Sequence, residues 1–216
     1  GKHVFCEKPP GRTVKDIMNV IKVEKKYSHL KLKYGFNHRY HDSVIRLKKI
    51  IDSKKYGKII NFRGVYGKSK IIPFSPSDWR SKKSEAGGGI LLDQGIHMLD
   101  LILNLSDDFN KVQSFVSNSF WNYDVEDNAY AIMKSKKGII AMLHSTATQW
   151  QHKFRLEISL ERALIELSGI LSSSKSYGEE KIKIIEKGNE RSKKRAKTIT
   201  ENYTEDLSWS REIKEF

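Results

Sequence analysis

The chain has 216 residues, of which 38% are hydrophobic and 31% charged, with 14 Gly and 4 Pro. These values fit one or two folded domains and exclude a disordered, collagen-like or low-complexity chain. The single Cys6 excludes an intramolecular disulfide, and the longest apolar run, 96–105, is too short to span a membrane. The first residues lack the regions of a signal peptide. We therefore expect a cytoplasmic protein without a membrane partner.

The formal net charge of +14 suggests an acidic partner. The 40 basic residues are 30 Lys and only 10 Arg, whereas base recognition and bidentate phosphate contacts favour Arg. The densest basic cluster, 187–197, contains no aromatic residue on which a base could stack. The sequence therefore predicts no nucleic-acid partner, and the positive field would equally attract acidic small molecules.

The first quarter of the chain alternates predicted strands and helices. Thr13 and Asp16 have the spacing of a capping box, and apolar residues then recur with helical spacing. His41 or Asp42 can cap a second helix that would run to Gly57. The predicted order is a strand at 2–6, a helix at 14–27, a strand at 30–36 and a helix at 42–57.

From residue 58 the apolar period changes to about two, which predicts a sheet. A loop at 73–80 and three glycines at 87–89 precede the most apolar predicted helix, 90–105. Short turns at 136–138 and 161–162 then indicate an antiparallel meander. Its predicted strands are 58–66, 112–121, 129–134, 139–149, 154–160, 163–167 and 182–186, followed by a polar loop at 188–198 and a helix at 206–216.

The helix after the glycines carries ionisable residues on an otherwise apolar face. At about 100° per residue, Asp93, His97 and Asp100 fall within about 60° of one another. They could form a catalytic group, or His97 could be a core histidine held by Asp93 or Asp100. A metal site is the third possibility, but no second His or Cys follows at ligand spacing, and we predict no metal.

Three other segments can contribute to a pocket. Lys8 lies where a strand ends in a loop and is either a proton donor or a surface lysine. Trp79 and Arg80 offer a stacking surface and an anion-binding fork, or simply anchor a loop. Trp150 and His152 end a long strand, where they line a pocket or cover a sheet edge.

The order of these motifs resembles the Gfo/Idh/MocA family of NAD(P)-dependent oxidoreductases, and the resemblance covers essentially the whole chain. The matching motifs are Glu7-Lys8-Pro9, the run from Gly35 to His41, Trp79-Arg80, and the glycines 87–89 with Asp93 and His97. The resemblance implies an α+β fold: an open, mainly antiparallel sheet with helices on one face, preceded by the last strand-helix-strand of a Rossmann domain. It also implies a homo-oligomer formed through the open sheet.

The resemblance implies roles for these residues. His97 would accept the hydroxyl proton as hydride leaves, Lys8 would lie beside the nicotinamide and the substrate hydroxyl, and Asp93 would orient them. Glu7, Lys8, Pro9, Trp79 and Arg80 would contact the cofactor. The weaker substrate-binding candidates are Arg39, Tyr40, Gln94, Trp150 and His152.

One departure from the family is the absence of a G-x-G-x-x-G turn, which binds the dinucleotide pyrophosphate. We therefore expect residues 1–36 to be the remnant of a Rossmann domain and residues 37–216 to be the substrate-binding and oligomerisation domain. The chain would then be truncated relative to the family and inactive alone, with NAD or NADP bound mainly by the missing domain.

The sequence thus predicts an oxidoreductase that moves hydride between NAD or NADP and a secondary hydroxyl of a sugar, cyclitol or nucleotide sugar. Two alternatives remain open. One is a nicotinamide-using sugar dehydratase or glycosidase. The other is a non-catalytic binding or assembly module that pairs through its sheet, although such a module would not require Lys8, Asp93 and His97.

Overall fold

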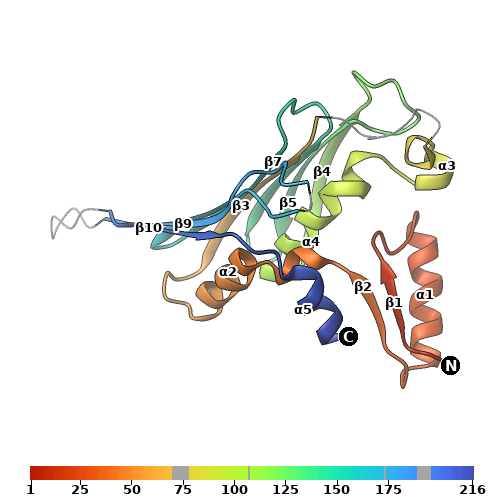
Figure 1. Ribbon diagram of the computed structural model, residues 1–216, viewed down its shortest axis with the longest axis horizontal. Coiled ribbons are helices and arrows are strands. Elements are labelled where there is room, and N and C mark those ends of the chain that lie inside the picture. The colour runs from red at the N-terminus through yellow and green to blue at the C-terminus, as the bar shows by residue number, and fades with distance from the viewer. Residues whose placement is uncertain (70–77, 107, 173, 189–195) are drawn as a thin grey trace.

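The computed structural model describes residues 1–69, 78–106, 108–172, 174–188 and 196–216 (Figure 1). The predicted loops at 73–80 and 188–198 lie partly outside these residues. The helical segments are α1 (Val14–Lys26), η1 (Asn37–Tyr40), α2 (Asp42–Asp52), η2 (Trp79–Ser81), α3 (Lys83–Ala86), η3 (Leu91–Gly95), α4 (Ile96–Leu105) and α5 (Ser208–Glu215). Among the described residues, no helix is long and apolar enough to cross a lipid bilayer.

Residues 1–36 form a small unit of two parallel strands, β1 (Val4–Glu7) and β2 (Leu32–Gly35), connected by α1. The predicted capping box is present, because the Thr13 hydroxyl accepts from the Asp16 amide and the Asp16 carboxylate accepts from the Thr13 amide. Helix α1 nevertheless has no buried residue, and Val14 and Met18 on its apolar side are exposed. We refer to residues 1–36 as the N-terminal unit.

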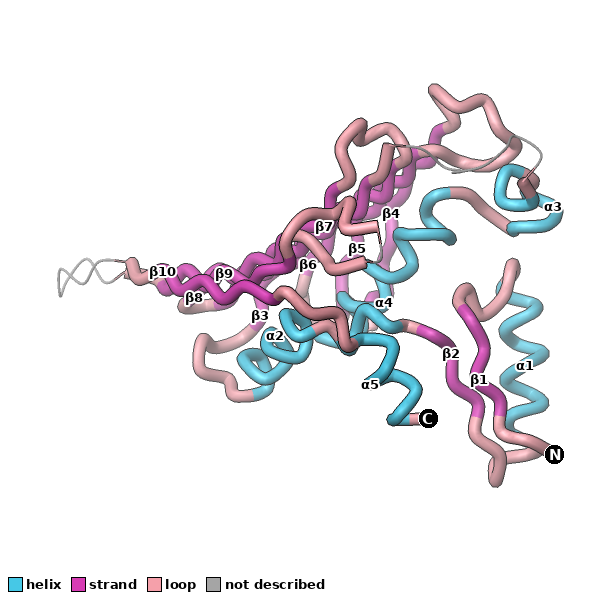
Figure 2. The backbone as a smooth tube through the Cα atoms, viewed as in Figure 1, coloured by secondary structure: helices cyan, strands magenta, loops and turns pink. Residues whose placement is uncertain are grey.

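The rest of the chain, which we call the sheet domain, builds one eight-stranded sheet in the order β10-β9-β8-β7-β3-β6-β5-β4 (Figure 2). Its strands are β3 (Ile59–Gly67), β4 (Phe109–Ser117), β5 (Asn128–Ser135), β6 (Ile140–Thr146), β7 (Lys153–Leu160), β8 (Ala163–Ser168), β9 (Glu180–Glu186) and β10 (Thr198–Tyr203). All neighbours are antiparallel except β3 and β6.

The predicted meander is wrong at one position. Strands β6 and β7 do not pair, because β3 lies between them, parallel to β6 and antiparallel to β7. The two predicted turns, 136–138 and 161–162, do connect neighbouring strands. Adjacency in sequence therefore predicted the hairpins correctly, but it could not predict where a strand from far along the chain would insert.

Three further predictions differ from the structure. Helix α2 ends at Asp52 rather than at Gly57, because Lys54 and Gly57 both adopt positive φ angles that end the helical path. Ile60 is half exposed, unlike its predicted partners on the buried face, because the register with β7 shifts there. Strand β10 was not predicted and begins where the polar loop was expected to end.

Helices α2 and α4 cover one face of the sheet, where the core lies (Figure 1). Helix α4 lies directly on β3. The approach is so close that a Cβ added at Gly64 would come within 2.7 Å of Met98. The largest fully buried side chains are Leu47, Ile90, Met98, Leu101, Ile102, Leu143, Leu156, Ile158, Ile165, Leu167, Ile170 and Ile182. This arrangement confirms the predicted α+β fold with a mainly antiparallel sheet.

Candidate active site

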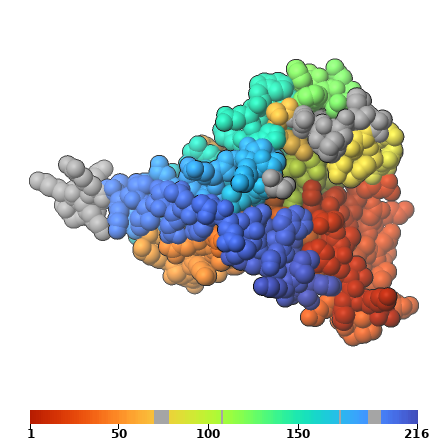
Figure 3. Space-filling view, in the orientation of Figure 1, coloured from red at the N-terminus to blue at the C-terminus, as the bar shows by residue number. Residues whose placement is uncertain are grey.

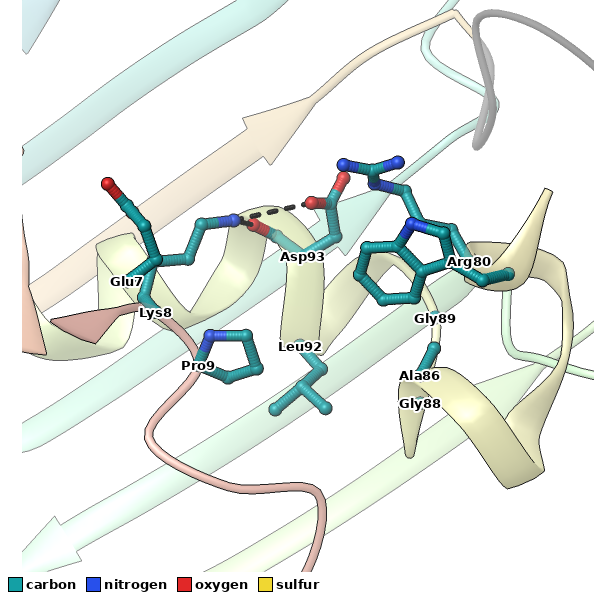
Figure 4. A pocket seen from close by; sticks show the side chains of 10 residues that line it. Glu7, Lys8, Pro9, Arg80, Ala86, Gly88, Gly89, Leu92 and Asp93 are labelled. Carbon is teal, nitrogen blue, oxygen red and sulfur yellow. Dashed lines mark hydrogen bonds and ion pairs between the residues drawn. The ribbon is translucent and has the colours of Figure 1, made fainter.

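The site begins where the N-terminal unit meets the helices on the sheet. Strand β1 ends at Glu7, and the next residue, Lys8, extends its ammonium group toward Asp93 (Figure 4). Lys8 Nζ donates to the backbone oxygen of Asp93 at 2.5 Å and lies 3.3 Å from Asp93 Oδ1. The side chain of Lys8 is mostly buried, with 18% of its surface exposed. The contact therefore joins the two regions of the chain at a charged pair.

Asp93 also binds a second lysine. Lys68, which directly follows β3, places Nζ 2.7 Å from Asp93 Oδ2. Burial alone would raise the pKa of Asp93, but Lys68 and Lys8 together hold this pKa well below its usual range. Asp93 is thus an anion shared by two cations and is not a proton carrier at neutral pH.

The helical segment that carries Asp93 starts at the glycines. The carboxylate of Glu126 accepts from the amides of Gly89 at 2.7 Å and Leu91 at 3.1 Å, so it caps the first turn. A Cβ at Gly89 would collide with the Glu126 backbone oxygen, which explains the need for glycine. The next turn, η3, is a π turn, and its wider winding rotates Asp93 relative to the residues of α4.

The three ionisable residues of this helix have different surroundings. Asp93 binds the two lysines, whereas Asp100 forms a bidentate ion pair with Arg39. His97 lies between them in the sequence but binds neither: its Nδ1 atom is enclosed without a partner, and no described carboxylate bonds to its ring. The interpretation of His97 as a core histidine held by an aspartate is therefore wrong.

His97 is 6% exposed and contacts two rings. The His38 imidazole is stacked on it at 4.0 Å with an interplanar angle of 15°, and the Phe36 ring lies edge-on at 5.9 Å. Burial, with a smaller contribution from Lys8, lowers the pKa of His97 to about 3, although the Asp93 charge acts in the opposite direction. His97 is therefore a neutral imidazole that can accept a proton.

Two cavities adjoin at Glu7 and Lys8. The first, which we call the glycine-side cavity, has a volume of about 450 Å³ and is lined by Glu7, Lys8, Pro9, Trp79, Arg80, Ala86, Gly88, Gly89, Leu92 and Asp93 (Figure 4). The second, the histidine-side cavity, measures about 460 Å³. Its walls include Asn37, His38, Tyr66, Gln94, His97, Ser172, Ser174, Tyr177, Asp206 and Trp209.

The structure brings most of the predicted site residues together. Glu7, Lys8, Pro9, Trp79, Arg80 and Asp93 line the glycine-side cavity, and Gln94 and His97 line the histidine-side cavity. The guanidinium of Arg80 lies 4.4 Å above the Trp79 ring. His152 lines neither cavity, but its ring lies 4.9 Å from that of Tyr177, which lines the histidine-side cavity.

Three predicted substrate-binding residues lie elsewhere. Arg39 and Tyr40 border a separate hollow, where Arg39 pairs with Asp100 and the Tyr40 hydroxyl bonds to Glu215. Trp150 is 61% exposed, packs against the Phe120 ring at 4.8 Å and lines neither of the two cavities. The pairing of Arg39 with a carboxylate on α4 turns this residue away from the histidine-side cavity.

Sequence reasoning missed four residues of the site. His38 lies within the matched run from Gly35 to His41, so its position in that motif was an available signal. Tyr66 has the strand period of a core residue, and nothing distinguished Tyr177 or Lys68 from ordinary surface residues. Within the described part of the chain, no group of three or more His, Cys, Asp or Glu side chains could hold a metal ion.

Comparison with known proteins identifies the family. A family profile described as the GFO/IDH/MocA C-terminal domain matches residues 44–166, more than half of the chain. The chain belongs to the Gfo/Idh/MocA family. Among curated Gfo/Idh/MocA relatives, levoglucosan dehydrogenase of Pseudarthrobacter phenanthrenivorans is 36% identical over 121 residues, which cover 54% of this chain and 30% of that protein. Inositol 2-dehydrogenase of Salmonella typhimurium is 24% identical over 176 residues, covering 80% and 49% respectively.

Solved structures of other proteins share the fold. Levoglucosan dehydrogenase in complex with NADH and levoglucosan aligns with a TM-score of 0.76 at 24% identity, over 94% of this chain and 55% of that one. Aldose-aldose oxidoreductase from Caulobacter crescentus, complexed with glycerol, aligns with a TM-score of 0.76 at 23% identity, over 97% and 59%. The chain thus spans half or less of the length of these two curated relatives.

Proposed function

We propose that this chain carries the catalytic part of an NAD(P)-dependent dehydrogenase that oxidises a secondary hydroxyl of a sugar or cyclitol, or reduces the corresponding ketone. The observation that carries the proposal is the neutral, carboxylate-free His97 on the wall of a cavity that also contains Lys8. The family and the names of the relatives, a levoglucosan and an inositol dehydrogenase, support the same class of substrate.

The glycine-side cavity fits the nicotinamide end of the cofactor. Pro9, Trp79 and Leu92 supply apolar surfaces for a flat ring, while Lys8 and Glu7 supply polar groups at the boundary with the histidine-side cavity. When bound there, the nicotinamide supplies the hydride chemistry. The pyrophosphate has no recognisable binding turn in this sequence, so the fit concerns the nicotinamide end alone.

The residues of the chain account for the remaining steps. An ammonium group has three donors, and Lys8 uses two of them on Asp93, so one remains for the substrate oxygen. As the hydride leaves the substrate carbon, the hydroxyl proton passes to the neutral His97. Asp93 keeps Lys8 in position and, because Lys68 also binds it, remains ionised throughout.

The lining of the histidine-side cavity favours an uncharged polyol. Asn37, Gln94 and Ser172 offer hydrogen bonds without charge, and Trp209 adds a half-exposed aromatic surface for a sugar ring. Lys8 is offset there by Glu7 and Asp206. The full-length gene product should therefore prefer sugars and cyclitols over their phosphate esters.

The test is an assay of the full-length gene product with NAD and NADP against a panel of sugars, cyclitols and their phosphates. We expect one equivalent of reduced cofactor for each equivalent of keto product. Product formed without a net change in the cofactor would instead support a dehydratase or glycosidase. No turnover with any member of the panel, by a protein shown to bind the cofactor, would overturn the proposal.

The proposed partner is a second copy of the protein, bound through the open face of the sheet. Phe115, Tyr130, Ile132 and Ile140 lie on this face with 46% to 81% of their surfaces exposed, and the first two are paired across β4 and β5. A contiguous apolar patch on a sheet is typical of an interface. Sedimentation equilibrium should give an oligomer for the wild type and a monomer for Phe115→Glu combined with Ile132→Lys, and equal masses would contradict this partner.

A further inference from the structure

His38 makes the closest described ring contact with His97 and takes no part in the proposed proton transfer. It lies on η1, directly before the sheet domain's first long helix, and is 8% exposed. Its imidazole is nearly parallel to that of His97, with the ring centroids 4.0 Å apart. We propose that His38 is a positioning residue, whose fixed ring holds the His97 imidazole in the orientation that accepts the substrate proton. This inference rests on the proposed function of His97.

The ring of His38 cannot turn without losing hydrogen bonds. Its Nδ1 lies 3.0 Å from Asn37 Oδ1, and its Nε2 lies 3.0 Å from the Tyr66 hydroxyl. Asn37 in turn donates from Nδ2 to the Ser208 hydroxyl, so its side chain is held by a second contact. Both nitrogens of His38 are therefore committed, and the ring is a rigid surface.

These contacts also determine the tautomer of His38. A carbonyl oxygen only accepts, so Nδ1 carries the proton and donates to Asn37. Nε2 is then the acceptor for the Tyr66 hydroxyl. Burial, together with the nearby His97, His41 and Lys8, lowers the pKa of His38 far below its usual value, so this ring remains neutral.

His97 needs such a surface because no hydrogen bond among the described residues orients its ring. In a histidine base that is bonded to a carboxylate, the hydrogen bond sets the ring plane and the tautomer. His97 has no described carboxylate partner and is instead enclosed by the face of His38 and the edge of Phe36. Since Nδ1 is enclosed, Nε2 is the atom left to meet the substrate, and its position depends on the stacked ring.

The enclosure of this pair keeps His97 neutral before the reaction, because burial and the Lys8 charge lower its pKa to about 3. The charged or titratable groups around this pair include Lys8, Asp93, His41 and Tyr66, and His41 is bound to Glu180 at 2.8 Å. His38 is thus the neutral neighbour that contacts His97 most closely.

The test separates the stack from the hydrogen bonds by comparing two variants. His38→Phe and His38→Leu both lose the bonds to Asn37 and Tyr66, but only phenylalanine keeps a flat ring against His97. His144→Ala is the control, because it removes a histidine stacked on Tyr130 at 3.9 Å on the open face. The readout is the ¹⁵N chemical shift and pH titration of His97 in this chain labelled with ¹⁵N-histidine.

We expect His38→Leu to change the His97 ring shifts and to raise its titration midpoint by about one pH unit or more, because water reaches the exposed ring face. His38→Phe should stay close to the wild type, and His144→Ala should leave His97 unchanged. In the full-length protein, His38→Leu should lower kcat by about tenfold or more with KM within a few-fold, since a misplaced base affects the chemical step.

Identical His97 shifts and titration midpoints in the wild type, His38→Phe and His38→Leu would overturn the positioning role. That outcome is distinct from a failure of the proposed function. In that case His97→Ala would retain activity in the full-length protein, while His38→Leu would still change the ¹⁵N shifts of His97 in this chain. If His38→Leu does not fold, His38→Met replaces the flat ring by a flexible side chain. Unchanged His97 shifts in His38→Met would equally contradict the role of a stacked ring.

Discussion

The N-terminal unit and the sheet domain contribute unequally to stability, although both contribute to the site. Helix α1 has no buried residue, whereas α4 buries Met98, Leu101 and Ile102 completely. In the space-filling view the unit lies beside the C-terminal end of the chain (Figure 3), and it meets the remainder of the chain through polar and aromatic contacts. These contacts include Lys8 with Asp93, Arg12 with the Ser84 carbonyl, Lys33 with Glu215, Phe5 with Phe216, the Phe36 amide with Glu212, and the Phe36 ring with His97.

This difference shows that packing and tethering position different parts of one site. His97, Asp93 and Lys68 are held by elements of the packed sheet domain, so their relative geometry follows from its core. Lys8 comes from the N-terminal unit, and its position depends on the ion pair with Asp93. The predictions below separate these two contributions.

The largest effect is expected from breaking the tether at the site. In the full-length protein, Asp93→Ala leaves Lys8 and Lys68 without their shared anion and frees Lys8 from the site, so kcat/KM should fall by about 10²-fold or more. Arg12→Ala removes a tether of the same unit that does not touch the cavities' charged groups, and it should cost only a few-fold. Steady-state kinetics measure kcat/KM for both variants. An equal fall in kcat/KM in the two variants would contradict a specific role for Asp93.

A smaller effect is expected from the core, and it sharpens the contrast between the two regions. Ile158→Ala, at a fully buried position on β7, should lower the free energy of unfolding of this chain by about 2–5 kcal/mol. Met18→Ala on α1, where the side chain is 48% exposed, should change it by no more than about 0.5 kcal/mol. Urea denaturation measures both, and similar losses would show that α1 is packed more tightly than its exposure indicates.

A third effect is a dependence of stability on pH. The pKa of His97 is lowered to about 3 in the folded chain, from an ordinary value near 6.5, so the unfolded chain binds more protons in this interval. The free energy of unfolding should therefore fall as pH decreases from about 6.5 toward 3, by at most about 1.4 kcal/mol per pH unit from this one group. Urea titrations at several pH values should give a shallower slope for His97→Gln, and an unchanged slope would contradict the buried neutral state.

Much of the fold could be predicted because its signals are local. The capping box at Thr13 and the alternation along β7 and β8 each depend on neighbouring residues, and the structure confirms these elements. The insertion of β3 between β6 and β7 depends on contacts between distant segments, which no local pattern encodes. Strand β10 was missed because the composition that precedes it is that of a polar loop.

The residues of the site also divide into those that local sequence indicates and those that depend on contacts between distant segments. Asp93 and His97 could be predicted because ionisable residues on an otherwise apolar helix face indicate a functional site, and the family resemblance implied a role for each. Lys68 and His38 could not be recognised as site residues, since their contacts with Asp93 and His97 exist only after β3 and η1 are placed. Arg39 was predicted to bind the substrate, but it forms an ion pair with Asp100, which lies about one helical turn after His97.

The central claim is that His97 is the acid/base of a hydride-transfer reaction. The most direct test is kcat of the full-length protein and its His97→Ala variant with the preferred substrate and saturating cofactor, with His29→Ala as a control at an exposed histidine. The account predicts a loss on the order of 10²–10⁴-fold for His97→Ala and none for His29→Ala. A His97→Ala variant that retains kcat within a few-fold of the wild type would contradict it.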